Sequence, residues 1–307
     1  MTAAAVPPVV AVVGATASGK TDLSLALAER LGGEIVNTDA MQVYRGMDIG
    51  TAKLPTAERR GIPHHLLDVL DIHETASVAE FQRMARAVIE DLRGRGVVPV
   101  LVGGSALYTR AVLDRFEFPG TDEAVRRELE DALAAHGPAA LHARLAATDP
   151  EAAAGILPGN GRRIVRALEV VTITGRPYSA SLPRRDYHLQ NAHQVGVAMD
   201  RPTLDQRIAR RVTAMFDGGF VDEVAGLVGR GLPQTRTASR AIGYPEVMAH
   251  LAGESTEDRA RESTAAATRR FARRQDSWFH KDDRIGWLGH DDDRMVDRAV
   301  ALVTGAG

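Results

Sequence analysis

The chain has 307 residues, a formal net charge of −2, 44% hydrophobic residues and 25% charged residues. These values are ordinary for globular proteins, exclude a disordered or fibrous chain, and suit one large domain with an insertion or two domains. The absence of cysteine excludes a disulfide framework and thiolate metal sites. The apolar run Val9 to Val13 is too short to cross a bilayer and no secretion signal precedes it, so we expect a cytoplasmic protein that does not act at a membrane. We also expect a monomer.

The first third of the chain alternates short β-branched runs with segments of helical periodicity. The expected elements are a strand over Val9 to Val13, a helix over Lys20 to Leu31, a strand over Glu34 to Thr38, a helix over Val78 to Leu92, a strand over Val97 to Val102 and a helix over Ala106 to Leu113. This alternation predicts an α/β fold with a parallel sheet flanked by helices, and places ligands at the carboxyl ends of the strands.

A change of pattern near Glu117 predicts a helical insertion over 117–190 within a core formed by 1–116 and 191–307. Four helical stretches follow one another there without a convincing strand: Asp122 to Ala135, Ala139 to Ala146, Pro150 to Ile156 and Arg162 to Thr174. Gln194 to Met199 then resembles a strand returning to the sheet, and the remainder is expected to be mainly helical.

A phosphate-binding loop is predicted between the first strand and the first helix. Its residues are Gly14, Ala15, Thr16, Ala17, Ser18, Gly19, Lys20 and Thr21, which match glycine, four residues, then Gly-Lys-Thr. In such a loop the backbone amides and the helix N-terminus hold phosphates, the lysine reaches the outer phosphates and the threonine hydroxyl can bind Mg²⁺. The alternative is a glycine-rich turn that matches by chance. The match makes the expected fold P-loop NTPase-like.

The next strong strand, Val97 to Val102, ends in Gly103, Gly104 and Ser105 without a carboxylate. P-loop ATPases place an acid there to hold magnesium and organise water. The loop could therefore hold a pyrophosphate that leaves. Asp39, at the end of the second strand, could be a general base for an amine or hydroxyl, or equally a turn carboxylate that caps the backbone.

The motifs together resemble those of the bacterial tRNA dimethylallyltransferases, also called tRNA isopentenyltransferases. They occur in the family's order: the phosphate loop, Asp39 to Lys53, Val102 to Tyr108, Arg163 to Glu169, Gln206 to Ile208, Ile242 to Glu246 and Thr268 to Trp278. The resemblance implies transfer of a dimethylallyl group from its diphosphate to the exocyclic amine of the adenosine immediately 3′ of the tRNA anticodon, with Mg²⁺ and release of pyrophosphate.

The resemblance also implies roles for individual residues. Asp39 would be the general base, Ser105 would position the base or substrate, and Lys20, Thr21 and Arg207 would manage the pyrophosphate and its metal. Ser105 stands at the threonine of the family's Gly-Gly-Thr and Arg162 at a usual glutamine. Residues expected to contact the anticodon stem-loop are Asp39, Ala40, Met41, Gln42, Ser105, Arg126, Arg127, Arg162, Arg163, Arg166, Arg269, Arg270, Arg273 and Arg274.

A basic stretch between Arg259 and Lys281 is suited to hold RNA phosphates, with a solvated helix face as the alternative. Four arginines, which we call the arginine face, are expected on one charged side of a helix: Arg269, Arg270, Arg273 and Arg274. Phe271, Trp278 and Phe279 are expected in the core. The spacing of His64, His65 and His73 matches no standard zinc site, so we expect ordinary histidines.

Without the resemblance, the main alternative is a nucleotide-type small-molecule kinase with the insertion as a lid. A transferase that makes free isopentenyl-nucleotides is a nearer relative, and an RNA-binding regulator without catalysis is a third possibility. ATP can occupy such a phosphate loop without being the productive donor. Labelled dimethylallyl diphosphate offered with tRNA or with free AMP separates these functions.

Overall fold

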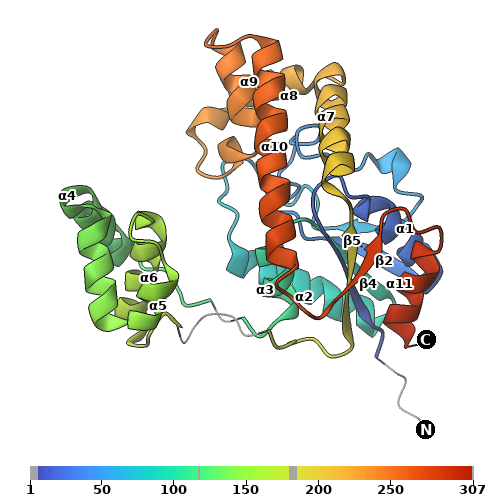
Figure 1. The fold of residues 1–307 in the computed structure, drawn as a ribbon, viewed down its shortest axis with the longest axis horizontal. Helices are drawn as coiled ribbons and strands as arrows, with labels where there is room; N and C mark the ends of the chain where they lie inside the picture. Colours follow the sequence, from blue (N-terminus) through green and yellow to red (C-terminus); the bar gives the residue numbers. More distant parts are fainter. Residues whose placement is uncertain (1–5, 117, 180–184, 306–307) are drawn as a thin grey trace. The chain divides into compact units, whose positions relative to one another are not determined.

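The computed structural model describes residues 6–116, 118–179 and 185–305. The chain divides into two compact units, of which unit 1 contains Met1–Leu113 and Leu189–Gly307 and unit 2 contains Asp114–His188 (Figure 1). The insertion predicted over 117–190 overlaps unit 2. In the described part of the chain, no helix is long and apolar enough to span a membrane.

Unit 1 is built on a six-stranded sheet whose order is β3-β2-β4-β1-β5-β6. All the strand pairs are parallel. The strands are β1 (Val9–Val13), β2 (Gly33–Asn37), β3 (His64–His65), β4 (Val98–Val102), β5 (Ala192–Ala198) and β6 (Ile285–Gly289). The predicted strands of the first third and the returning strand near Gln194 are therefore confirmed. Because every strand runs the same way, their carboxyl ends meet at one edge of the sheet.

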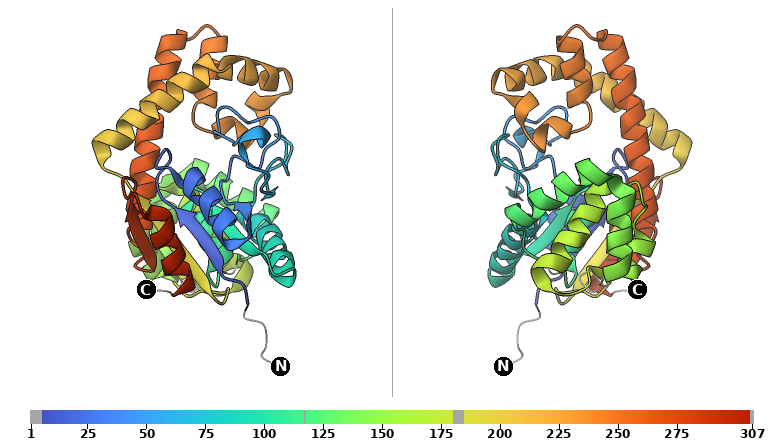
Figure 2. Two further views of the ribbon diagram at one scale, coloured as in Figure 1. Left: turned by 90° about the vertical axis from the view of Figure 1, so that its right-hand side faces the viewer. Right: turned by 90° about the vertical axis from the view of Figure 1, so that its left-hand side faces the viewer.

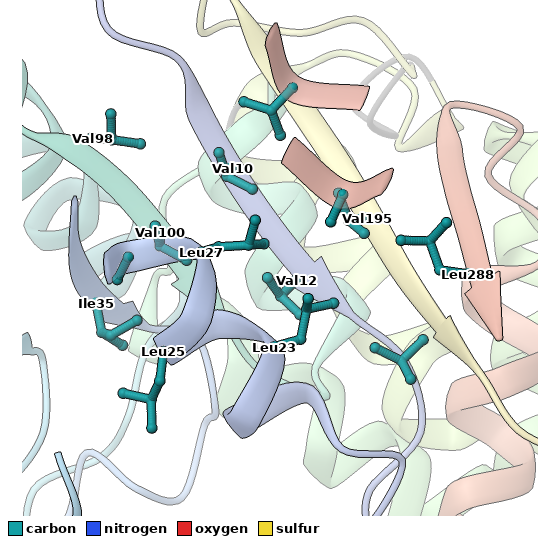
Figure 3. Packing of buried hydrophobic residues seen from close by; sticks show 14 residues of the cluster. Val10, Val12, Leu23, Leu25, Leu27, Ile35, Val98, Val100, Val195 and Leu288 are labelled. Carbon is teal, nitrogen blue, oxygen red and sulfur yellow. The ribbon is translucent and has the colours of Figure 1, made fainter. Parts of the chain in front are cut away.

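Helices cover the sheet on both sides. They are α1 (Lys20–Leu31) and α11 (Met295–Thr304) on one side, and α2 (Val78–Gly94) and α3 (Ala106–Leu113) on the other (Figure 1). Leu23 and Leu27 of α1 pack with Val10 and Val12 of β1, both of which are fully buried (Figure 3). The alternation of side chains along β1 makes both of its faces apolar, as a strand covered on two sides requires. The predicted P-loop NTPase-like α/β class is confirmed by this architecture.

A second layer of helices rises beyond the carboxyl ends of the strands (Figures 1 and 2). It contains α7 (Arg201–Asp217), α8 (Phe220–Gly229), α9 (Tyr244–Leu251) and α10 (Glu257–Phe279). Short 3₁₀ turns lie at Thr56–Glu58, Leu232–Gln234 and Ala238–Arg240. Asp200 caps α7 by accepting a hydrogen bond from the Thr203 amide at 3.0 Å, and Thr256 caps α10 in the same way. The two caps fix where the longest helices of this layer begin.

Unit 2 is helical, with α4 (Glu123–Thr148), α5 (Pro150–Gly155) and α6 (Gly161–Thr174). Gly137, at φ 75° and ψ 169°, breaks α4 immediately before Pro138, so the two predicted helices are the two halves of α4. Leu129, Leu145 and Leu168 belong to its own apolar core. A separate core supports folding as a compact unit.

Candidate active site

The phosphate loop lies between β1 and α1, where the strand, loop and helix arrangement was predicted. Gly19 has φ 101°, a left-handed conformation that glycine adopts without strain, and it directly precedes α1. The Lys20 ammonium folds back onto the loop and donates to the Ala15 carbonyl at 2.6 Å. Ala17 has φ 67°, which a residue with a Cβ seldom adopts. A sharply turned loop of this kind directs backbone groups toward an anion.

Lys20 is poised to respond to negative charge. Burial and the neighbouring Arg211 guanidinium lower the pKa of Lys20 to about 7, and the Asp39 carboxylate partly opposes them. A bound diphosphate would place negative charge next to Lys20 and so stabilise its protonated form. The loop therefore becomes most cationic when an anion is present.

Asp39 follows β2 and sits in a tight turn. Its backbone amide donates to the Asn37 side chain at 2.8 Å, and its Oδ1 accepts from the Met41 amide at 2.8 Å. Burial raises the pKa of Asp39, against the backbone amides and the charge of Lys20. The carboxylate thus has the turn contacts of a cap and, at the same time, a raised proton affinity of the kind that a general base uses.

The turn after β4 brings Ser105 to the same edge of the sheet. Ser105 Oγ accepts from the Tyr108 amide at 3.4 Å at the start of α3. Gly103 permits a close approach, because a Cβ there would lie 2.5 Å from the backbone carbon of Thr38. The end of β4 is therefore fixed against the residue that precedes Asp39.

Two arginines of α7 face the phosphate loop, and only Arg207 was predicted. Its guanidinium lies 3.9 Å from where a Cβ on Gly19 would stand. Arg211, one helical turn later, donates to the Thr16 hydroxyl at 3.3 Å. Burial and the charge of Arg207 lower the pKa of Arg211. The four-residue spacing from Arg207 was the available signal for Arg211, because residues so spaced share a helix face.

Gln275 of α10 was also missed. Its Oε1 accepts from the Thr16 amide at 2.8 Å and its Nε2 donates to the Gly104 carbonyl at 2.8 Å. The side chain is buried, with 5% of its surface exposed. No sequence signal near Gln275 specifies partners that are 171 and 259 residues away.

The segment that follows Asp39 forms a tightly bonded loop. Lys53 is buried and donates to Asp48 at 2.5 Å and to Asp68 at 2.6 Å. The Gln42 side chain donates to the Thr51 carbonyl at 3.0 Å. Lys53 and Arg211 both line a cleft of about 820 Å³ between this loop and α7. The predicted contact residue Gln42 is therefore held in place by its own loop.

The arginines predicted to contact RNA fall into two groups. The arginine face lies on α10, and none of its four members is within 4 Å of a carboxylate of the described residues. In unit 2, Arg126 and Arg166 donate to the fully buried Glu169 at 2.5 Å and 2.8 Å. Burial opposes ionisation of Glu169, but these hydrogen bonds hold its pKa below the ordinary value. Arg127, Arg162 and Arg163 are exposed.

The aromatic residues of α10 differ from the expectation in one case. Phe279 is buried as predicted and Phe271 is half-buried beneath the Arg274 guanidinium. Placing Trp278 in the core was wrong, since it is 51% exposed with the Lys281 ammonium 5.6 Å from its ring centroid. The buried stripe of α10 follows Ala272, Gln275 and Phe279, and Trp278 projects beside it.

Each of the three histidines has its own partner. His64 lies against the Ile62 carbonyl, His65 against Glu34 and His73 against the Arg230 carbonyl. Within the ranges that the structure describes, no three histidine or acidic side chains gather into a metal cluster. These contacts give each histidine a structural hydrogen bond.

The parallel sheet, the phosphate loop and the carboxylate at the end of β2 define a P-loop-type enzyme. A family model described as IPP transferase matches residues 42–282. The chain is 70% identical over 296 residues to a tRNA dimethylallyltransferase of a Nocardioides species, covering 96% of each chain. It is 60% identical over 302 residues to a tRNA dimethylallyltransferase of Thermobifida fusca, covering 96% of this chain and 94% of the relative. The chain belongs to the IPP transferase family, and the predicted resemblance is confirmed.

Solved structures agree with this assignment. The tRNA isopentenylpyrophosphate transferase of Bacillus halodurans is 40% identical, with a TM-score of 0.72 and coverage of 97% of this chain and 96% of that one. A eukaryotic dimethylallyltransferase acting on tRNA is 26% identical, with a TM-score of 0.85 over 98% of this chain and 79% of that one. Both likenesses extend over nearly the whole chain.

Proposed function

We propose that this chain transfers a dimethylallyl group from dimethylallyl diphosphate to the exocyclic amine of the adenosine immediately 3′ of the anticodon in tRNA. The observation that carries the proposal is the placement of Lys20, in the phosphate loop after β1, and Asp39, in the turn after β2, at one edge of the sheet, where their charges influence each other. One group suits the leaving diphosphate and the other suits the attacking amine. The shared edge of the sheet holds both.

Stabilisation of the leaving group dominates the proposed chemistry. An adenine amine is a weak nucleophile because its lone pair is delocalised into the ring, so the bond from the allylic carbon to oxygen must weaken early. Lys20, Arg207 and Arg211 bring positive charge to the phosphate loop. Preorganised charge of this kind acts on the negative charge that develops on the diphosphate. The loop from Gly14 to Thr21 supplies backbone amides for the same oxygens, apart from the Thr16 amide, which donates to Gln275, and the Ser18 amide, which donates to the Ala15 carbonyl at 3.3 Å.

A divalent metal ion, Mg²⁺ in our proposal, fits the hydroxyl groups of the loop. The Thr21 side chain is exposed at the first turn of α1, and the buried Ser18 hydroxyl has no hydrogen-bond partner among the described residues. Hydroxyl oxygens with substrate phosphates are typical ligands for Mg²⁺, which uses few protein groups. Thr21 would hold the ion. When bound, Mg²⁺ neutralises charge on the diphosphate.

Proton transfer completes the proposed reaction. A bond forms from the amine nitrogen to the allylic carbon, the carbon–oxygen bond to diphosphate breaks, and the amine loses one proton to Asp39. Met41 and Gln42 amides hold the carboxylate in place. Ser105 stands at the end of β4, from which its hydroxyl can orient the adenine. A positioned base contributes about 10² to 10⁴ in rate.

The RNA contacts remain part of the proposal. A loop adenosine must leave its stack to reach a half-buried carboxylate, so the enzyme is expected to extrude the base. The arginine face has no carboxylate partners in the described structure and is suited to backbone phosphates. Arg127, Arg162 and Arg163 offer exposed charge in unit 2, whereas Arg126 and Arg166 hold Glu169 and support that surface from within.

The test offers labelled dimethylallyl diphosphate with either bulk tRNA or free AMP. We expect label in tRNA, located in the nucleoside 3′ of the anticodon after nuclease digestion, and none in AMP. Label in AMP alone would identify a free-nucleotide transferase. Phosphate transfer from ATP to a small acceptor, with no prenyl transfer, would identify a kinase and refute the proposal.

A further inference from the structure

Gln275 joins the two sides of the proposed site. Its amide accepts from the Thr16 backbone N–H in the phosphate loop and donates to the Gly104 carbonyl beside Ser105, both at 2.8 Å. A side-chain amide is suited to this because it carries an acceptor and a donor at fixed separation. The phosphate loop and the turn that contains Gly104 and Ser105 are thereby bound to a single side chain of α10.

Gly104 allows the Gln275 amide to approach closely. A Cβ on Gly104 would lie 2.2 Å from Nε2 of Gln275, so glycine is needed for this close approach. Gln275 is buried, and a buried amide without one of its partners would leave a polar group unsatisfied. Both hydrogen bonds are therefore needed to satisfy the buried amide.

Thr16 forms a second hydrogen bond, in which its hydroxyl accepts from another helix. Arg211 of α7 donates to the Thr16 hydroxyl at 3.3 Å while Gln275 of α10 accepts from its amide. The Thr16 N–H is thereby engaged within the protein. Both long helices of the upper layer thus contact the phosphate loop, and Gln275 also connects it to Gly104.

We infer that Gln275 is a positioning residue that sets the phosphate loop against the Ser105 turn for transfer. The inference rests on the proposed function. An error of about 1 Å in the relative placement of reacting groups costs about 100-fold in rate. Loss of Gln275 should therefore lower the chemical step by about 10- to 100-fold while the separate affinities for diphosphate and tRNA change by less than about threefold.

The experiment compares Gln275→Leu, Gln275→Glu and the control Ser277→Ala, an exposed position on the same helix. Single-turnover rates are measured with saturating tRNA and dimethylallyl diphosphate, and each dissociation constant is measured separately. Gln275→Glu keeps the size and an acceptor for Thr16, but its carboxylate faces the Gly104 carbonyl without a proton. As the pH falls from about 8 to about 6, protonation of this buried carboxyl restores a donor, so its rate relative to the wild type should rise.

The outcomes separate this inference from the proposed function. Absence of prenyl transfer by the wild type and by Ser277→Ala would overturn both. Transfer by these two, with unchanged single-turnover rates in both Gln275 variants, would overturn the positioning role alone. If Gln275→Leu does not fold, the pH dependence of Gln275→Glu decides, and a rate ratio that is flat with pH contradicts the inference.

Discussion

The low pKa of Lys20 predicts that diphosphate binding takes up a proton. Burial and Arg211, against the opposing charge of Asp39, lower this pKa to about 7 from 10.5. A bound diphosphate stabilises the ammonium form and raises the pKa again. At pH 8 the free site is then about one-tenth protonated, so binding should take up about 0.9 proton, and at pH 6 only about 0.1.

The same shift sets the size of the pH effect on affinity. The bound-state pKa lies above the free-state value, so the attraction is complete below pH 7 and is lost as pH rises toward the bound-state value. Affinity should fall by about tenfold per pH unit in that window. Complete restoration of the lysine to its ordinary value of 10.5 from about 7 sets an upper limit of about 10³ to 10⁴ in affinity.

Calorimetry with pyrophosphate in buffers of different ionisation enthalpy measures the proton count directly. Lys20→Met is the matched control, because it keeps an unbranched side chain of similar length without the amine and reports protonation of the ligand itself. We expect the difference between the two proteins at pH 8 to be about 0.9 proton. A difference near zero at pH 8, with both proteins binding pyrophosphate, would refute the assignment of a largely neutral lysine in the free site.

The remaining predictions concern the base, the RNA surface and unit 2. Asp39→Asn should lower the single-turnover rate by about 10² to 10⁴ with tRNA affinity within about threefold, and a reduction below about tenfold would contradict the base role. Because the pKa of Asp39 is raised, wild-type rates should fall as pH drops through it. Alanine at all four positions of the arginine face should weaken the salt dependence of tRNA binding. The slope of log affinity against log salt concentration should fall by about one unit for each phosphate that is no longer bound. An unchanged slope in a folded variant would show that this face does not contact tRNA. Glu169→Ala leaves Arg126 and Arg166 without their carboxylate and should lower the free energy of unfolding of unit 2 by about 3 kcal/mol, measured by urea unfolding. A change under about 0.5 kcal/mol would show that these two ion pairs do not stabilise unit 2.

Local patterns predicted the elements that carry the phosphate loop. β1 and α1 have the predicted bounds, because a β-branched run and helical leucine spacing are signals within a few residues of sequence. β6 was missed because two of its five residues are glycine, which disfavours strands, and its pairing with β5 depends on residues far away in the chain. The two-residue strand β3 is too short to leave a pattern.

The site residues also differ in whether sequence could predict their positions. Lys20 and Asp39 could be placed together because the carboxyl ends of parallel strands share an edge. Gln275 could not, since its contact with Thr16 joins segments 259 residues apart. Arg211 lies 195 residues from Thr16, and its spacing from Arg207 indicated only that the two arginines share a helix face. Arg126 and Arg166 look like free charge in sequence, and only the structure reveals that the buried Glu169 binds both.

The most direct test of the account is prenyl transfer to a defined anticodon stem-loop by the wild type and by Asp39→Asn. The two substrates are identical except that one carries adenosine and the other purine riboside, which lacks the exocyclic amine, immediately 3′ of the anticodon. We predict that the wild type adds one dimethylallyl group to the adenosine substrate and none to the purine riboside substrate, and that Asp39→Asn binds the adenosine substrate but transfers slowly. Transfer to the substrate without the amine, or full transfer by Asp39→Asn, would contradict the account.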